Sequence, residues 1–265
     1  MTESIQALAP PDTAIAGSEP PEGVWYFLSN EWYKGRQPWF FDASLLAGTT
    51  ILEDNWKLIK EEIDAYYAAH AAEMKPNFTP YAYSEPGWKT VNLYSYFLRY
   101  ERNCVRFPVT TEIVERIPDM CMAQIAVLEP HTRLKAHIGD CNAVIRSHLG
   151  LTVPGGLPEL GMIVGREKRT WKEGKVFAIS IAHRHYAWNL TDRHRIVLVV
   201  DVVHPDYRDR RYEVAGGALA AIAMKFCATR FPRLKRLPRR VTRALHALLG
   251  LMARLRLWLQ RTTGV

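Results

Sequence analysis

Cysteine is scarce in this sequence of 265 residues, and none of its four cysteines stands in a C-x-x-C spacing. The missing pairs argue against a zinc knuckle, whose ligands come in closely spaced pairs. They also argue against a disulfide framework, which is typical of small secreted domains. A reducing compartment, the cytoplasm, fits this cysteine content best.

The sequence also lacks a targeting segment and a long apolar run. The first residues have no basic start followed by an apolar core, so we expect no signal peptide. Residues 1 to about 22 are rich in Pro, Ala, Ser and Glu, which predicts disorder. No C-terminal apolar piece reaches the roughly 20 uninterrupted residues of a membrane span. We expect a cytoplasmic protein, with peripheral attachment to the inner face of the membrane left open.

Acidic residues are absent from the C-terminal end. Residues 214 to 265 contain eleven Lys or Arg and no Asp or Glu, which leaves 24 basic and 27 acidic residues in the rest of the chain. The formal net charge of +8 therefore belongs to the tail alone. This distribution argues against a nucleic-acid-binding body and indicates a basic appendage with its own partner.

The tail combines these charges with apolar segments. Residues 214 to 224 are small and apolar, residues 231 to 243 form a cationic linker with two prolines, and residues 244 to 261 predict a helix. Basic residues beside an apolar helix suit the interface of an anionic membrane. The alternative is a terminal helix that docks on the body or on a second subunit, and nucleic acid is not expected as a partner.

The body of the chain begins with helices and continues with strands. Residues 51 to 72 predict a helix because apolar side chains recur at helical spacing, and residues 110 to 117 predict a shorter one. Residues 87 to 100 and 122 to 130 predict strands. The aromatic residues between 24 and 41 either form a lip for a substrate or pack as an arm on the domain, and packing is favoured because aromatic side chains bury large areas.

Histidine and arginine gather in the second half of the chain, in runs that predict β-strands. In RSHLGLTV, Arg146 and His148 are two residues apart, so both side chains leave the same face of a strand. His183 and His185 repeat this spacing, and Arg195 opens an apolar run. Imidazoles bind iron, zinc or copper, and a guanidinium pairs with a carboxylate through two hydrogen bonds. Together they predict a cavity that binds a metal and a dicarboxylate.

The same stretch resembles the aspartyl/asparaginyl β-hydroxylase family, which also includes bacterial lipid A hydroxylases. The family pattern has a histidine, an R-x-H-L-G-L strand nine residues later and a W-x-x-G turn. A second histidine in H-x-x-W-N follows, then an arginine ten residues later that opens an apolar strand ending in H-P. This chain matches with His137, RSHLGL from Arg146, WKEG from Trp171, HYAWN from His185 and RIVLVVDVVHP from Arg195. The match covers roughly residues 85 to 206 and is specific as a spaced set.

The resemblance implies a mainly β fold, a double-stranded β-helix of the jelly-roll or cupin kind, with N-terminal helices packed outside it. The dioxygenase domain would span residues 23 to 213, with the β-helix core at about 85 to 206. The basic helical appendage would follow at 214 to 265. The implied activity is an Fe(II)- and 2-oxoglutarate-dependent hydroxylase that uses O2 to insert one oxygen atom into an unactivated C–H bond.

Individual residues take their roles from the same resemblance. His137 and His185 would be the catalytic pair that binds Fe(II). Arg195 would anchor the distal carboxylate of 2-oxoglutarate. Arg146 and His148 would contact this cosubstrate or an acidic group of the substrate.

Two questions concern the metal ligands. Many dioxygenases of this fold carry a carboxylate two residues after the first histidine, where this chain has Gly139. Members of the family can hold iron with two histidines and water, and the neighbouring Asp140 is the candidate for a third protein ligand. His183 competes with His185 for the second position, and the spacing from the WKEG turn favours His185.

Three further positions carry specific expectations. Trp88 matches a wall of the cosubstrate pocket and fits a core indole equally well. Ala126 stands near a serine of many relatives and cannot make its hydrogen bond. Asp201 interrupts the apolar run and predicts a hydrogen-bonded structural carboxylate rather than a catalytic one.

Three functions follow from these observations. The basic tail favours hydroxylation of an acyl chain of a membrane lipid. The second function is β-hydroxylation of an aspartyl, asparaginyl or other amino-acid or peptide substrate. The third, a non-catalytic jelly-roll that binds a small acid or tethers partners, would be expected to have lost a histidine or Arg195, and all of these are present.

Overall fold

The computed structural model describes residues 22–28, 32–77, 79 and 87–263. The predicted disorder of residues 1 to 22 therefore lies outside the described residues, except for Glu22. The strands within the described part are β1 Phe40–Phe41, β2 Trp88–Ser95, β3 Leu98–Arg99, β4 Met120–Leu128, β5 Thr132–Arg133, β6 Val144–Thr152, β7 Leu160–Val164, β8 Glu167–Arg169, β9 Val176–Ser180, β10 His185–Asn189 and β11 Arg195–Val203.

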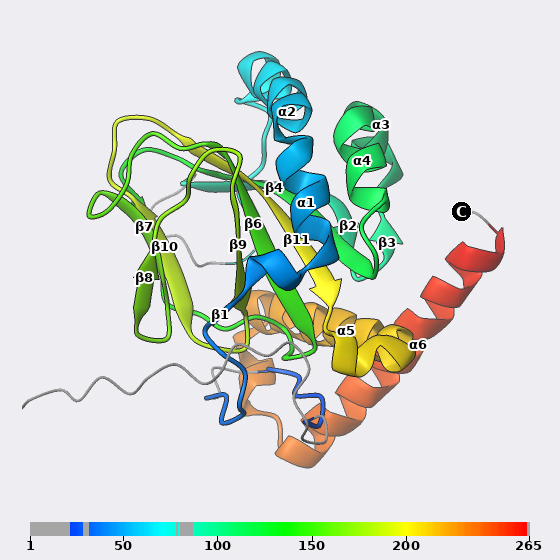
Figure 1. Cartoon of the computed structure of the whole chain (residues 1–265). Coiled ribbons are helices and arrows are strands. Elements are labelled where there is room, and N and C mark those ends of the chain that lie inside the picture. The colour runs from blue at the N-terminus through cyan, green and yellow to red at the C-terminus, as the bar shows by residue number, and fades with distance from the viewer. Residues whose placement is uncertain (1–21, 29–31, 78, 80–86, 264–265) are drawn as a thin grey trace, which may run out of the picture.

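These strands form two antiparallel sheets that face each other (Figure 1). The larger sheet has the order β1-β9-β6-β11-β4-β2-β3, and the smaller has the order β5-β10-β7-β8. Sequence neighbours such as β9 and β10 lie in different sheets, so the chain winds between the two layers. The predicted mainly β, double-stranded β-helix is confirmed.

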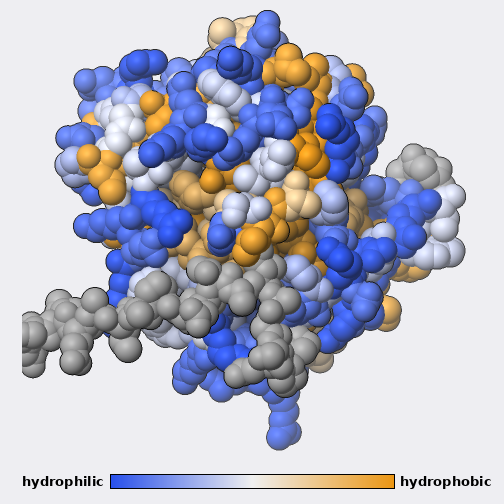
Figure 2. Space-filling view, in the orientation of Figure 1, coloured by the Kyte–Doolittle hydropathy of each residue, from blue (hydrophilic) through white to orange (hydrophobic). Residues whose placement is uncertain are grey.

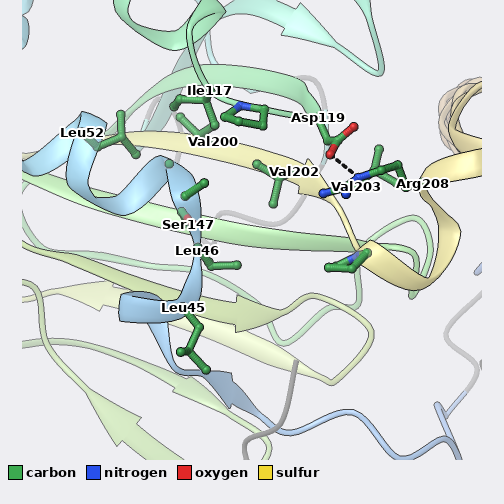
Figure 3. A pocket seen from close by; sticks show the side chains of 14 residues that line it. Leu45, Leu46, Leu52, Ile117, Asp119, Ser147, Val200, Val202, Val203 and Arg208 are labelled. Carbon is green, nitrogen blue, oxygen red and sulfur yellow. Dashed lines mark hydrogen bonds and ion pairs between the residues drawn. The ribbon is translucent and has the colours of Figure 1, made fainter. Parts of the chain in front are cut away.

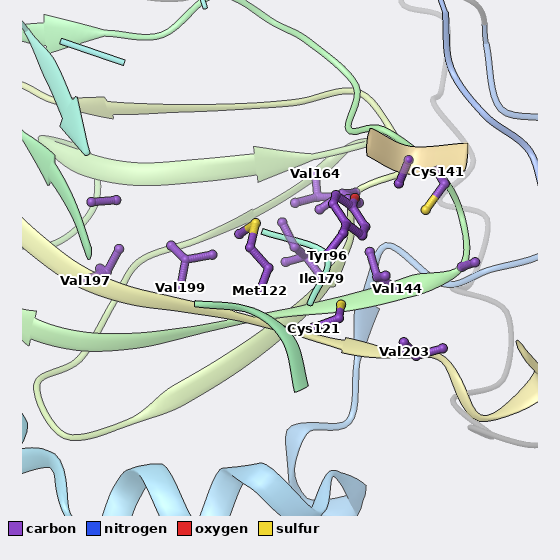
Figure 4. Close-up of a cluster of buried hydrophobic side chains, with 14 of the residues drawn as sticks. Tyr96, Cys121, Met122, Cys141, Val144, Val164, Ile179, Val197, Val199 and Val203 are labelled. Atoms are coloured by element: carbon purple, nitrogen blue, oxygen red, sulfur yellow. The ribbon is translucent and has the colours of Figure 1, made fainter. Parts of the chain in front are cut away.

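The core between the sheets follows from the two-residue period of the strands. Val197, Val199 and Val203 of β11 point into the space between the sheets, together with Met122 of β4 (Figure 4). The alternate residues of β11, with Leu198 at their centre, face the opposite side, where helices cover them. A central strand covered on both faces is almost entirely apolar, as RIVLVVDVV is apart from Arg195 and Asp201.

Helices cover the outer face of the larger sheet (Figure 1). The predicted helix at 51 to 72 is two helices that meet at Asn55, and the predicted helix at 110 to 117 is confirmed two residues earlier. The side-chain amide of Asn55 donates to the carbonyl of Ile51 at 2.8 Å, a local bond that competes with the helical backbone. The bounds are η1 Ala43–Leu45, α1 Ala47–Asp54, α2 Trp56–His70, α3 Glu101–Arg106 and α4 Pro108–Glu115.

The predicted single strand at 87 to 100 is a hairpin instead. Tyr96 and Phe97 adopt positive φ angles of 46° and 68°, which turn the chain between β2 and β3. In the described part of the aromatic segment at 24 to 41, Phe27, Phe40 and Phe41 are buried on the domain, as favoured from the sequence, while Trp32 is exposed.

The C-terminal appendage is a helical hairpin that docks on the body. η2 Pro205–Arg210 leads from β11 into α5 Arg211–Arg230, which is followed by η3 Pro232–Arg236 and α6 Arg239–Thr263. The predicted linker at 231 to 243 is shorter than expected, because α6 already begins at Arg239. Small residues of α5, from Val214 to Ala221, are buried against the domain. Among the helices that the structure describes, none has the length and apolar content needed to cross a membrane.

Candidate active site

One pocket between the two sheets collects all six residues that the sequence assigns to the site. His137 reaches it from the segment after β5, and the remaining five come from β2, β6, β10 and β11. The pocket is completed by Gln124, Ala126, Leu134, Met162, Trp171, Ala187, Val197 and Val199. Arg146 and His148 do leave the same face of β6, as the two-residue period predicts.

His137 and His185 form a pair at one end of this pocket. Their backbones are joined by two hydrogen bonds of 3.0 and 2.9 Å, and their rings lie 4.4 Å apart between centroids. Nδ1 of His137 lies 2.8 Å from the carbonyl oxygen of Lys135, and Nδ1 of His185 lies 2.8 Å from that of His183. Because a carbonyl can only accept, each Nδ1 carries the proton and each Nε2 carries the lone pair, the arrangement that metal-binding histidines use.

Both imidazoles are kept neutral by their surroundings. Burial lowers the pKa of His137 to about 4. Burial also lowers the pKa of His185 well below its ordinary value, and the neighbouring His137 lowers it further. A neutral imidazole is the form that binds a metal ion, so this pair is ready to act as ligands near neutral pH.

The structure leaves no room for a carboxylate at the position two residues after His137. A Cβ atom on Gly139 would lie 2.5 to 2.7 Å from the side chain of Ile181. The carboxylate of Asp140 points elsewhere: it pairs with Lys225 of α5 at 3.0 Å and accepts a hydrogen bond from Tyr96 at 3.4 Å. No group of three His, Cys, Asp or Glu able to hold a metal occurs in the described part of the chain, so Asp140 does not join the two histidines.

The other end of the pocket offers hydrogen-bond donors. The indole of Trp171 donates to Nδ1 of His148 at 3.2 Å, so the proton of the neutral His148 ring is on Nε2. Nε2 of His148 and Nε of Arg195 are both buried and have no hydrogen-bond partner among the described residues. Two unsatisfied donors in one pocket indicate a site for an anion such as a carboxylate.

Arg195 is a buried cation that rests on an aromatic ring. Arg195 is only 3% exposed, and its guanidinium carbon lies 4.5 Å from the ring centroid of Trp171. Burial lowers the pKa of Arg195 to about 9, and no nearby charge offsets this effect. From the sequence we expected Trp171 only as part of a turn. The structure shows that it also contacts Arg195 and His148 and therefore belongs to the site.

Arg146 lines the pocket but has a partner that the sequence did not assign to it. Its Nε and one terminal nitrogen each donate to the carboxylate of Asp201 at 2.8 Å. Burial works to lower the pKa of Arg146, but the adjacent carboxylate raises it above its ordinary value. The predicted hydrogen-bonded role of Asp201 is confirmed, and the predicted contact of Arg146 with a ligand would have to use its remaining N–H groups.

Trp88 and Ala126 line the pocket, and His183 lies outside it. Trp88 lines the pocket, 6.2 Å from His137 between ring centroids, and also packs against the core between the sheets. Ala126 lines the pocket as well, without a polar side chain. His183 was expected on the same strand face as His185 but lies in the turn before β10, where its Nε2 contacts the carbonyl oxygen of Gln37 at 2.8 Å.

A second pocket lies on the outer face of the larger sheet, beneath α1 (Figure 3). Its walls are mostly apolar, and Ser147 of β6 points into it because it alternates with Arg146 and His148. Its charged groups are Asp119 and Arg208, which pair with each other at 2.6 Å at the rim. No histidine is among the residues that line it.

The chain is similar to several known hydroxylases. The chain is 40% identical over 118 residues to an ornithine lipid ester-linked acyl 2-hydroxylase of Rhizobium tropici, a match that covers 44% of this chain and 42% of that protein. It is 29% identical over 180 residues to the aspartyl/asparaginyl beta-hydroxylase of Homo sapiens, with 64% and 23% covered. A collagen prolyl hydroxylase of Paramecium bursaria Chlorella virus 1 aligns with 54% of this chain and 91% of its own at 12% identity and a TM-score of 0.35, too low to add to the topology.

The chain spans less than half the length of these two curated relatives. A model of one family, described as aspartyl/asparaginyl beta-hydroxylase, matches residues 53–205, which is more than half of the 265 residues and includes every residue assigned to the site. The chain therefore belongs to the aspartyl/asparaginyl β-hydroxylase family.

Proposed function

We propose that this protein is an Fe(II)- and 2-oxoglutarate-dependent hydroxylase that acts on an acyl chain of a membrane lipid. The proposal rests on one observation: a neutral histidine pair and two unsatisfied donors share a single buried pocket. The first feature suits a metal ion, and the second suits the carboxylate of a small acid. Together they match the needs of a metal-dependent oxygenase with an acidic cosubstrate.

His137 and His185 would bind the iron through Nε2. The carbonyl oxygens of Lys135 and His183 hold the two rings by their Nδ1–H groups and fix the orientation of the lone pairs. With two protein ligands only, most coordination positions stay available for cosubstrate, O2 and water. Iron bound with 2-oxoglutarate and O2 supplies the oxidant for hydroxylation of a C–H bond.

Arg195 and His148 would bind the distal carboxylate of 2-oxoglutarate. Each has a buried donor that lacks a partner, and a carboxylate would satisfy both while neutralising the buried guanidinium. Trp171 fixes both groups, since its indole bonds to His148 and its ring lies against Arg195. We assign this carboxylate to Arg195 rather than to Arg146, because Asp201 already neutralises Arg146.

The walls of the pocket favour an apolar substrate. Leu134, Met162, Ala187, Val197 and Val199 supply apolar surface next to the histidine pair. An aspartyl or asparaginyl substrate would need donors of its own, and the one other pocket cation, Arg146, is engaged by Asp201. The 40% identical relative is named for the hydroxylation of a lipid acyl chain, which agrees with this choice. Hydroxylation of a peptide, after the name of the human relative, is the second candidate.

The test is a product assay with the full-length protein, Fe(II), 2-oxoglutarate and O2. One reaction contains a membrane lipid extract and another contains peptides with Asp and Asn. Mass spectrometry should find one added oxygen atom on a lipid acyl chain, with the product lost in His185→Ala and retained in His183→Ala. Oxygen added to the peptides alone would replace the lipid proposal by the second candidate.

A further inference from the structure

α6 has two apolar faces, of which the docking on the domain uses one. Along this face His246 lies 2.9 Å from the carbonyl oxygen of Gly217 through its Nε2, and Leu257 is buried. Gly250 approaches Gly216 so closely that a Cβ on Gly216 would lie 2.8 Å from the carbonyl oxygen of Gly250. The small residues of α5 thus hold α6 against the molecule by one side only.

The opposite face of α6 carries large apolar side chains in contact with solvent. Apart from one adjacent pair, these residues stand three or four apart, so they form one stripe along the helix. The exposed fraction of each lies between 55% and 58%. We call this set the α6 stripe: Leu248, Leu251, Met252, Leu255 and Trp258.

Basic residues accompany the stripe, and acidic residues do not. α6 contains six arginines and no Asp or Glu. Arg240, Arg243 and Arg256 are exposed. Figure 2 shows mostly hydrophilic side chains over the lower part of the molecule, where Figure 1 places α5 and α6.

The apolar stripe and the neighbouring arginines together favour an anionic membrane over a second copy of the chain as the binding partner. A second copy of the chain would bring its own exposed arginines of α6 against these, and like charges at an interface repel. An anionic bilayer offers apolar depth for the leucines and negative charge for the arginines at once. A tryptophan at the end of the stripe suits the boundary between acyl chains and headgroups.

We propose that α6 docks the protein on an anionic membrane surface, with the α6 stripe buried at the interface and the arginines contacting lipid headgroups. The helix lies in the plane of the membrane, and the α5–α6 hairpin connects it to the catalytic domain. This inference does not depend on the proposed hydroxylase activity, because membrane binding is measured without iron, 2-oxoglutarate or O2.

The test is co-sedimentation of the full-length protein with vesicles of phosphatidylglycerol and phosphatidylcholine in equal parts, beside vesicles of phosphatidylcholine alone. We expect binding to the anionic vesicles at low salt and weaker binding at high salt. Affinity should fall about tenfold or more when the stripe is made polar in the triple variant Leu251→Ser, Leu255→Ser, Trp258→Ser. It should stay unchanged in a matched control made from exposed apolar residues elsewhere, Leu58→Ser, Val105→Ser, Leu157→Ser.

The charges are tested in the same way. Each basic residue near an anionic surface strengthens binding about fivefold, so loss of three should weaken it on the order of a hundredfold. The variant is Arg240→Gln, Arg243→Gln, Arg256→Gln, and its control removes three exposed arginines outside the tail, Arg102→Gln, Arg106→Gln, Arg166→Gln. Equal losses in variant and control would overturn the proposal.

Light scattering of the lipid-free protein tests the alternative that a second copy of the chain binds to the α6 stripe. The proposal expects a wild-type mass that the stripe variant leaves unchanged. A wild-type dimer that the stripe variant converts to a monomer would overturn the membrane assignment in favour of a second copy of the chain. Wild-type protein that sediments with neither kind of vesicle would overturn it as well.

Discussion

Replacement of Arg195 by methionine should change the stability of the free protein and its affinity for 2-oxoglutarate in opposite directions. Arg195 is buried, its Nε has no partner, and the pKa of its guanidinium is lowered from 12.5 to about 9 by burial alone. At 1.36 kcal/mol per pKa unit, this corresponds to roughly 5 kcal/mol of unfavourable burial. The unbranched side chain of methionine fills much of the same space without a charge.

Two losses offset this gain in Arg195→Met. The contact of the guanidinium with the Trp171 ring contributes about 1 to 2 kcal/mol. Imperfect filling of the site costs about 1 kcal/mol more. The free energy of unfolding of the ligand-free variant should therefore exceed that of the wild type by about 2 to 3 kcal/mol.

Ligand binding should show the opposite sign. A buried charge pair that loses one partner costs about 2 to 5 kcal/mol, so the affinity for 2-oxoglutarate should fall by a factor of roughly 30 to several thousand. Urea unfolding with and without 2-oxoglutarate measures both quantities, since a ligand at 100 times its Kd adds about 2.7 kcal/mol to the wild type. A ligand-free variant less stable than the wild type by 3 kcal/mol, or 2-oxoglutarate affinity within threefold, would refute the reasoning.

Three further predictions concern neighbouring groups. Asp201→Asn leaves the guanidinium of Arg146 without its carboxylate and should lower the free energy of unfolding by about 3 to 5 kcal/mol in urea titration; a loss below 1 kcal/mol would contradict the buried pair. Gly139→Ala forces a Cβ against Ile181 and should cost about 1 to 3 kcal/mol by the same assay, whereas an unchanged stability would show that the space exists. Burial lowers the pKa of His137 to about 4, so the folded state favours the neutral ring. The contribution of His137 to the free energy of unfolding should therefore be fully present above pH 6.5. It should fall by roughly 3 kcal/mol as the pH is lowered from 6.5 to 4. His137→Gln should lack this part of the pH dependence, and identical profiles would exclude His137 as its source.

Much of the site follows from short-range patterns in the sequence. The two-residue period of a strand places Arg146 and His148 on one face, and the structure has both in the pocket. The spacing also prefers His185 to His183, and only His185 reaches the pocket between the sheets. The first expectation holds because it depends on strand geometry, which the local sequence determines. The choice of His185 rests on the spacing of the family pattern, since strand geometry alone placed His183 on the same face.

The parts that the sequence did not predict depend on contacts between distant segments. Asp201 reads as a structural carboxylate, but its partner Arg146 is 55 positions away on the neighbouring strand. The pairing of Asp140 with Lys225 links the loop after His137 to the C-terminal appendage across 85 positions. No local period relates such residues, since sheet pairing and helix docking bring them together only in the folded chain.

The central claim, that His137 and His185 form a metal site beside a 2-oxoglutarate site, is tested most directly by an anaerobic titration with Fe(II) and 2-oxoglutarate. The charge-transfer absorption band of the iron–2-oxoglutarate complex is followed in the wild type and in single alanine variants of three histidines. The account predicts a band in the wild type and in His183→Ala, whose ring lies outside the pocket, and no band in His137→Ala or His185→Ala. A wild type without the band, or a band that persists without His185, would contradict it.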